Sequence, residues 1–241
     1  MIALSSTILG NGVYMSAIGI LSKGWVGDLP VQLGRRFCAL GQQVSFGPGE
    51  IVYSAGEEAN SLYGCLGGTL RLSFAGENGA LRFVHLMGPG MWTGDFAFLS
   101  NQPRAFELRT SEAARLLRID RGAVLRLAHD HPETWKWLAF CTACNLGLAM
   151  TVADHLMIRD AGKRLAATLL RLSARLGSHP SVAPIDRLLL TQSDLADAAN
   201  LSLSATGRLL RSLHSQGLID VSYGEIGIVN APRLQSLVEK C

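Results

Sequence analysis

The stretch from Trp137 to Ala153 contains 17 consecutive residues without a charged side chain, and no other segment constrains the fold as strongly. It lies within a helical pattern that runs from Asp130 to about Asp160. Asp130 as N-cap, Pro132 in the first turn and Glu133 at the capping-box position predict where this helix begins. A helix that is apolar on nearly every face must be buried on more than one side.

Three environments meet that requirement. A transmembrane span would include Thr142, Asn145 and Thr151 among its 17 uncharged residues, which is the short and polar limit for a bilayer. A monomeric core would enclose the helix completely. In the third environment, one face packs on the rest of the chain and another on a second copy. A seam with alternating steps of four and three residues favours this homodimer. We therefore expect a second copy of the chain as the partner of the helix, and no membrane. The seam comprises Leu138, Thr142, Asn145, Ala149, Val152 and Leu156.

The segment before this helix has the composition of an antiparallel β-structure. Twelve of the 26 glycines lie between Gly41 and Gly94, in turn-like clusters that separate short β-rich runs. The run Thr69–Phe74 alternates polar and apolar residues, as a half-buried strand does, and the region from Ala105 to Ile119 supplies two further runs. This spacing of strands and turns predicts a β-barrel or β-sandwich.

The segment after the long helix reads as a small helical domain. An amphipathic helix, "AGKRLAATLLRLSARLG", ends at Gly177, and two short helices then meet at Asn200. Asn tolerates the left-handed conformation that such a turn requires. Thr191 and Ser202 are the expected N-caps of the two helices, and "LIDVSYGEIGIVN" is a wing-like hairpin. Helix, turn, helix and wing favour DNA binding over an inert helical hairpin.

Charge is distributed in agreement with that interpretation. Residues 1–162 carry 13 basic and 13 acidic side chains, whereas residues 163–241 carry nine basic and six acidic ones. The whole net charge of +3 therefore lies in the C-terminal part, as expected for a polyanion partner.

The order of these segments resembles the Crp/Fnr superfamily of bacterial transcription factors, over roughly Trp25 to Val229. The motifs are "FGPGEIVYSAGEEANSLYGCLGGTLRL", "RDAGKRLAATLLRL" and "DLADAANLSLSATGRLLRSLHSQGLI". The resemblance implies an α+β fold with an N-terminal antiparallel β-roll of the cyclic-nucleotide-binding, jelly-roll type, a long dimerisation helix and a C-terminal winged helix-turn-helix. The expected divisions are an arm at 1–24, the β-roll at 25–129, the dimerisation helix at 130–162 and the DNA-binding domain at 163–241.

In this family the second helix of the motif enters the major groove, and a dimer reads two half-sites. The resemblance implies double-stranded DNA and RNA polymerase as partners, and it matches Arg208 to an arginine that reaches DNA. Leu203 and Ser204 stand where well-known members have Arg and Glu, which implies a different target sequence. The expected DNA contacts are Ser193, Ser202, Leu203, Ser204, Thr206, Gly207, Arg208, Arg211 and Tyr223.

The resemblance also assigns "GDFAFLSNQPRAFEL" to the cassette that holds a cyclic nucleotide. The family has Gly-Glu and Arg-Ser there, whereas this chain has Gly94-Asp95 and Arg104-Ala105. Arg104 keeps the charge that binds a phosphate, but Ala105 cannot donate a hydrogen bond. With Thr142 and Asn145 of the long helix, these four residues are the candidate effector site. Cyclic AMP or another cyclic nucleotide, a different small ligand and no ligand at all remain alternatives, and in the last case Asp95 and Arg104 would pair with each other.

Other chemistries have less support in the sequence. Five cysteines at irregular spacing do not predict disulfides. Cys141 and Cys144 lie three residues apart, but they are better explained as small buried side chains than as metal ligands. No nucleophile–base set or metal-ligand cluster appears, so we expect neither an enzyme nor a metal site. The first basic residue is Lys23, which argues against a signal peptide and for the cytoplasm. A constitutive DNA-binding dimer with a ligand-free β-roll and a cyclic-nucleotide-responsive signalling subunit are the alternative functions.

Overall fold

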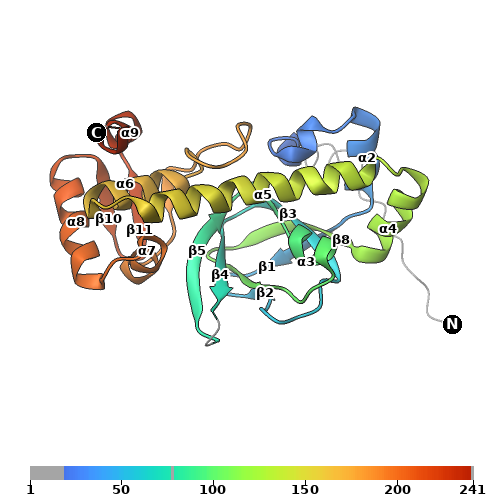
Figure 1. Cartoon of the computed structure of the whole chain (residues 1–241), viewed down its shortest axis with the longest axis horizontal. Coiled ribbons are helices and arrows are strands. Elements are labelled where there is room, and N and C mark those ends of the chain that lie inside the picture. The colour runs from blue at the N-terminus through green and yellow to red at the C-terminus, as the bar shows by residue number, and fades with distance from the viewer. Residues whose placement is uncertain (1–18, 77–78, 240–241) are drawn as a thin grey trace.

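The computed structural model describes residues 19–76 and 79–239. One long helix, α5 (Thr134–Met157), runs along the molecule and connects a β-domain to a smaller helical domain (Figure 1). The N-terminal arm expected at residues 1–24 lies mostly outside the described residues. Before the β-domain come a 3-10 turn at Trp25–Asp28 and α2 (Val31–Ala39).

The β-domain consists of two four-stranded antiparallel sheets, in the orders β1-β8-β3-β6 and β2-β7-β4-β5. The strands are β1 (Gln42–Phe46), β2 (Ile51–Tyr53), β3 (Ser61–Gly67), β4 (Leu70–Ala75), β5 (Leu81–Met87), β6 (Trp92–Thr93), β7 (Phe106–Thr110) and β8 (Ala114–Asp120). Between the sheets lies a core that includes Tyr53, Tyr63, Leu70, Leu108 and Leu116. The expected β-roll, derived from glycine spacing and from the resemblance, is confirmed.

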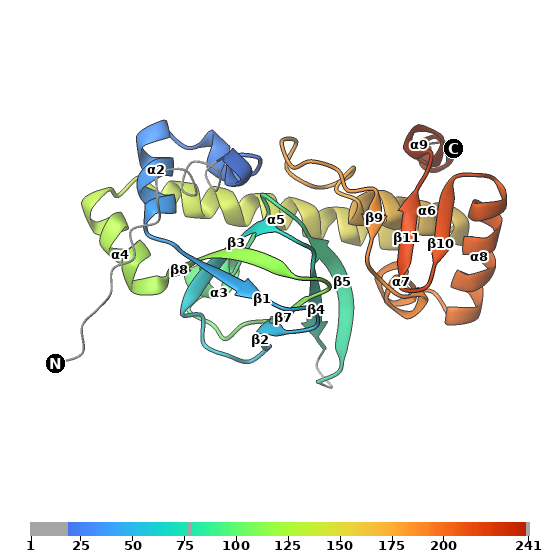
Figure 2. The same cartoon turned by 180° about the vertical axis from the view of Figure 1, so that it is seen from behind.

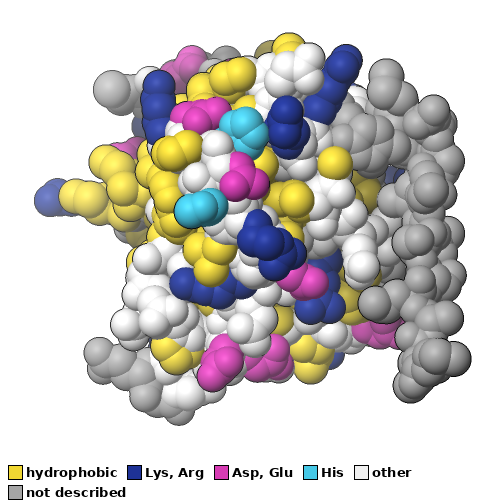
Figure 3. All heavy atoms as spheres, turned by 90° about the vertical axis from the view of Figure 1, so that its right-hand side faces the viewer, with side chains coloured by type: hydrophobic (Ala, Val, Ile, Leu, Met, Phe, Trp, Pro, Cys, Tyr) yellow, Lys and Arg dark blue, Asp and Glu magenta, His cyan; other side chains and the backbone are white. Residues whose placement is uncertain are grey.

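Two short helices flank this roll. Helix α3 (Asp95–Ser100) follows β6, and α4 (Arg121–Asp130) follows β8. Figure 3 shows the end of the molecule formed by α2 and α4, where basic and acidic side chains are intermixed. Among the described residues in this view, the two signs of charge therefore alternate instead of forming one basic surface.

The predicted start of the long helix at Asp130 is wrong. Asp130 is the last residue of α4, and α5 begins at Thr134, with Glu133 at the N-cap position and no side-chain cap. The break follows from Pro132, because a proline disfavours helical backbone at the residue before it. His131 accordingly has φ −133° and ψ 80°.

Helix α5 has three distinct faces. Leu138, Cys141 and Asn145 face the β-domain: Leu138 and Cys141 are buried, and the Asn145 side chain bonds to it. The second face lies under the loop 174–186, where the His179 ring packs edge-on against Phe140 and its Nε2 donates to Asp28 Oδ2 at 2.7 Å. The third face is open and apolar, with exposed or small residues at steps of four and three: Ala139, Ala143, Leu146, Met150, Ala153 and Met157.

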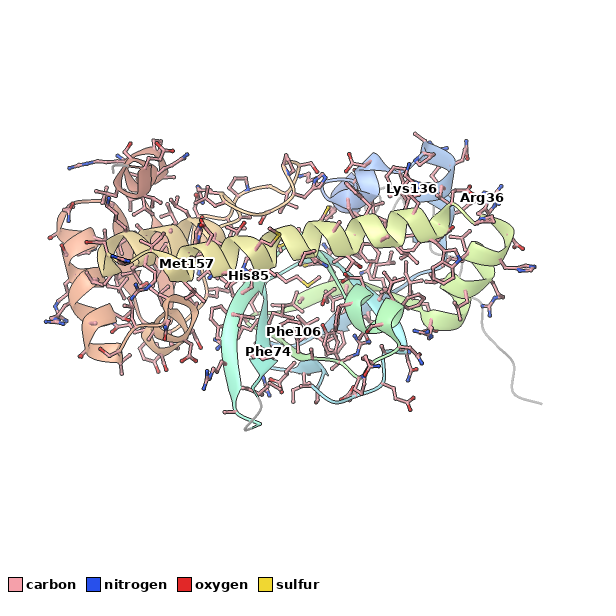
Figure 4. The ribbon with its side chains drawn as sticks, viewed as in Figure 1. Arg36, Phe74, His85, Phe106, Lys136 and Met157 are labelled. Atoms are coloured by element: carbon pink, nitrogen blue, oxygen red, sulfur yellow. The ribbon has the colours of Figure 1, made fainter. Side chains whose placement is uncertain are left out.

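The predicted seam is therefore wrong in phase. Its first half, Leu138, Thr142 and Asn145, is directed at the β-domain of the same chain. The open face, called the α5 stripe below, lies about a quarter turn away around the helix. Figure 4 shows Met157 at the end of this helix that meets the C-terminal domain.

By length and composition α5 is also apolar enough to cross a membrane, and 11% of its most apolar window is buried in the described part of the chain. The most exposed apolar side chains, Leu146, Met150 and Met157, lie on the open face, whereas the other two faces contact the β-domain and the loop. A bilayer would surround the helix on all sides, whereas a partner helix covers a stripe.

The C-terminal domain begins with α6 (Ala161–Leu172), capped by Asp160, which accepts from the Lys163 amide at 2.8 Å. This helix ends at Leu172 rather than at Gly177 as expected, because Ala174 adopts a positive φ of 58°. The rest of the domain consists of β9 (Arg187–Leu188), α7 (Gln192–Ala199), α8 (Leu203–Ser215), β10 (Ile219–Ser222), β11 (Glu225–Ile228) and α9 (Ala231–Glu239).

The two domains share an apolar core. Phe83 and Leu86 of β5 belong to the same buried cluster as the leucines of α6, α7 and α8. Figure 2 shows β5 on the side of the β-domain that faces α7 and α6. The position of the C-terminal domain is therefore set by packing on β5 as well as by the connection through α5.

Two arginines add polar contacts across this boundary. Arg71 of β4 forms a two-pronged ion pair with Asp194 of α7. Arg171 of α6 is fully buried; its Nη1 donates to Val84 O at 2.9 Å and lies 3.4 Å from His85 Nδ1, while Nη2 donates to Ala198 O. Burial lowers the pKa of Arg171 to about 10, and burial together with Arg171 lowers the pKa of His85 to about 3. His85 is therefore neutral, beside a buried guanidinium (Figure 4).

Candidate DNA interface and effector site

The helix-turn-helix forms as its capping residues predict. Thr191 and Asp194 make a reciprocal capping box at the start of α7, and the Ser202 hydroxyl accepts from the Ala205 amide at 3.2 Å at the start of α8. Asn200 connects the helices with φ 48° and ψ 58°, in the left-handed region. Ala196 and Ala199 are buried at the crossing, as expected from their size. These contacts fix the angle between the two helices.

One face of α8 is open to solvent. Ser204, Arg208 and Arg211 are exposed and follow each other at steps of four and three, so they lie in one row along the helix. Leu203 is exposed beside this row at the start of α8, and Ser193 and Ser202 are exposed nearby in sequence. This open face, with two guanidinium groups, is the side of α8 that a DNA groove could meet.

Two of the expected contact residues do not face outward. Thr206 is fully buried, and its hydroxyl donates to Ser202 O at 3.1 Å. Gly207 is also buried, and a Cβ built there would lie 3.3 Å from Gln192 Oε1 of α7. Both were expected as DNA contacts, but both are buried, so the open face of α8 does not include them.

The hairpin of β10 and β11 forms the expected wing. Ser222 pairs with Glu225, and the turn between them has Gly224 at φ 71° and a fully exposed Tyr223. Arg187 of β9 forms an ion pair with Glu225, which ties the wing to the third strand of this sheet. The wing therefore presents one aromatic phenol at its tip on a braced sheet.

The candidate effector residues lie together between β6, α3 and α5. Gly94 precedes α3 with φ 97°, and Asp95 begins the helix while buried at 4% exposure. The Asn145 amide donates to Asp95 Oδ1 at 2.8 Å and to Trp92 O at 3.3 Å. Burial raises the pKa of Asp95, and hydrogen bonds from Thr142 and Asn145 oppose that rise.

Arg104 lies in the interior of the roll. Its guanidinium stacks on Tyr53 at 3.9 Å from the ring centroid, lies 5.6 Å from the Tyr63 centroid and donates to Ser61 O at 2.8 Å. Within the described part of the chain Arg104 and Asp95 form no ion pair with each other, so the expected alternative of a mutual pair is wrong. Ala105 is half-buried and offers only its backbone, through which it accepts from the Ala75 amide.

Sequence reasoning missed the aromatic residues of this site. Tyr53 and Tyr63 fill the roll beside Arg104, with ring centroids 5.7 Å apart, and the Tyr53 hydroxyl bonds to Thr93 at 2.8 Å. The available signal was an aromatic residue at an inward position of each of two adjacent strand runs, "IVYS" and "SLYGCL". Inward aromatics are common in any β-core, so the pattern alone does not mark a site.

The cysteines lie in environments that disfavour the thiolate form. Burial raises the pKa of Cys38 and Cys65 to about 12 and that of Cys141 well above its usual value. A thiolate is the form that binds metals and reacts with oxidants. Among residues 19–76 and 79–239 no group of three or more His, Cys, Asp or Glu side chains has metal-binding geometry.

Comparisons with known proteins agree with this architecture. Residues 43–131 match the cyclic nucleotide-binding domain family, and residues 163–237 match the Crp-like helix-turn-helix domain. The chain is 25% identical over 193 residues to the CRP-like cAMP-activated global transcriptional regulator of Mycobacterium tuberculosis, covering 80% of this chain and 86% of that protein. It is 25% identical over 231 residues to the nitrogen fixation regulation protein FixK of Bradyrhizobium diazoefficiens, covering 94% of each.

A solved structure has the same fold. The structure of FixK2 from Bradyrhizobium japonicum aligns with a TM-score of 0.67 at 22% identity, over 83% of this chain and 98% of that one. The two matched domains together span more than half of this chain. The chain therefore belongs to the Crp/Fnr superfamily of transcription regulators.

Proposed function

We propose that this chain is a cytoplasmic, homodimeric regulator that reads double-stranded DNA with α8 and acts with RNA polymerase at promoters. The open row of Ser204, Arg208 and Arg211 on α8 carries the DNA-binding part of this proposal. A guanidinium can bind guanine O6 and N7 in two-pronged fashion, and serine can donate to a base or a phosphate. Tyr223 at the wing tip, Ser193 and Ser202 complete the surface as phosphate contacts.

The α5 stripe supports the homodimer. Leu146, Met150 and Met157 are 59%, 65% and 80% exposed, and alanines alternate with them along the stripe. Steps of four and three residues suit a helix packed against a second copy of itself, and small residues allow close approach. A two-fold axis along this stripe would place two α8 helices on the same side of the dimer, as required to read two half-sites about 34 Å apart.

The experiment selects an operator from a random duplex library with the full-length protein, and then measures binding to that operator and to a scrambled duplex. We expect Arg208→Ala to weaken operator binding by about 1–3 kcal/mol, roughly 5- to 150-fold, with a smaller loss on scrambled DNA. Arg233→Ala is the matched control, because Arg233 is exposed on α9, away from the α8 row.

Two results would overturn parts of the proposal. An equal loss on operator and scrambled DNA would reduce Arg208 to a phosphate contact. A protein that enriches no sequence from the library, in any buffer tested, would refute sequence-specific DNA binding altogether.

A further inference from the structure

The cassette of this chain is bonded to α5 by its own side chains. Asn145 uses its amide nitrogen to reach both Asp95 of α3 and the carbonyl of Trp92 in β6. Thr142, one turn earlier on α5, also supports the Asp95 carboxylate. Asp95, Thr142 and Asn145, three of the six residues expected to contact an effector, therefore contact each other.

The space beside them is filled. Tyr53 and Tyr63 are buried, and Arg104 is stacked on the first ring and bonded to Ser61 O.

A groove of about 550 Å³ lies elsewhere, between β4, β5 and α7, and none of the six candidate effector residues lines it. Within the cassette, Arg104 Nη1 and Asp95 Oδ2 are buried without hydrogen-bond partners, which is the one feature that suits a polar ligand. Asp95 Oδ1 already accepts from Asn145, Arg104 Nη2 already donates to Ser61 O, and Ala105 has no side-chain donor. The residues present therefore do not fit a cyclic nucleotide.

We propose that this β-roll works without a cyclic nucleotide, and that the Asn145–Asp95 bond is the link through which the cassette holds α5 in its DNA-binding position. The inference rests on the proposed function, because its readout includes DNA binding. The chain is then a regulator whose own side chains make the connection that an effector makes in a ligand-dependent one.

The first test is direct binding. Cyclic AMP and cyclic GMP are titrated to 1 mM into the full-length protein, with calorimetric heat and the intrinsic fluorescence of its four tryptophans as readouts. We expect no saturable heat and less than a twofold change in operator affinity with either nucleotide. A saturable signal below 1 mM, or a tenfold gain in operator affinity, would overturn the proposal.

The second test addresses the bond. Asn145→Ala is expected to lower operator affinity about tenfold, whereas Asn60→Ala, at an exposed position outside the cassette, leaves it unchanged. Asn145→Asp places two carboxylates together and should lower operator affinity further. The double variant Asp95→Asn with Asn145→Asp should restore operator affinity, because it reverses the donor and the acceptor of the bond. If Asn145→Ala does not fold, the comparison of Asn145→Asp with the exchange still decides the question. Equal affinities of Asn145→Ala and Asn60→Ala, or no recovery in the exchange, would refute the role of the bond.

The two proposals fail differently. If no operator is enriched and the nucleotide titrations give no binding signal, the proposed DNA binding is wrong and the proposal of a ligand-free cassette is supported. If an operator is bound only with nucleotide, DNA reading stands and the ligand-free cassette is wrong.

Discussion

Replacing Leu146 by alanine tests the α5 stripe most directly. The leucine is 59% exposed in one chain, so more than half of its surface is available to a partner. Full burial of a leucine contributes about 1.5–3 kcal/mol, so the exposed share is worth roughly 1–2 kcal/mol per copy. Both copies lose it in a symmetric dimer, which gives about 2–4 kcal/mol. We therefore expect the dimer dissociation constant to rise roughly 30- to 1,000-fold.

Sedimentation equilibrium over a range of protein concentrations measures that constant. Val31→Ala is the matched control, because Val31 on α2 is 67% exposed and lies outside the stripe. If Leu146→Ala and Val31→Ala change the dimer dissociation constant equally, the assignment of the interface is refuted. A chain that is monomeric at every concentration would refute it as well, while partition of the protein into lipid vesicles would favour a membrane role for α5.

Three further predictions concern stability, measured by urea unfolding. Arg71→Ala should lower the free energy of unfolding by about 1–3 kcal/mol, because it removes the charged partner of the partly buried Asp194. Arg187→Ala, at the exposed pair with Glu225, should have a smaller effect, because water screens that pair; equal losses would contradict the ranking. The pKa of His85 is about 3 in the folded chain, compared with 6.5 for the unfolded chain. Between these values the unfolded chain binds one more proton, so the free energy of unfolding falls as the pH drops through that window. At pH 4.5 this loss in the free energy of unfolding is about 2–3 kcal/mol, and His85→Gln should remove it. If the free energy of unfolding of His85→Gln falls with pH as steeply as that of the native protein, His85 is excluded as the cause. Asn200→Val should cost about 1–2 kcal/mol and Asn200→Gly almost nothing, because Asn200 has a positive φ of 48°; the reverse order would refute the backbone argument.

Local chemistry predicted the C-terminal motif well. Thr191, Asn200 and Ser202 act through hydrogen bonds and backbone preferences within a few residues, so their roles can be read without knowledge of the tertiary structure. The glycine-rich turns predicted the β-roll for the same reason. Features set by nearby residues were therefore accessible from the sequence.

Features set by distant contacts were not. Because α5 carries no charged side chain from Trp137 to Ala153, several apolar stripes exist on it, and the β-domain contacts of Leu138 and Asn145 select which one remains open. Thr206 and Gly207 were expected among the DNA contacts, but both are buried in the folded domain, and Gly207 lies against Gln192 of α7. The filled cassette was inaccessible in the same way, since it requires Tyr53, Tyr63 and Arg104 from three separate strands and loops to meet.

The buried guanidinium of Arg171 has a consequence for biosynthesis. Its acceptors are Val84 O, on a strand made early, and Ala198 O, on a helix made late. During translation the outer side of β5, with Phe83 and Leu86, stays uncovered until more than a hundred further residues have left the ribosome. A nascent chain that stalls before that point exposes the apolar side of β5 to solvent, where it can aggregate or bind a chaperone. Chaperones and the rate of elongation therefore influence how this regulator reaches its native state.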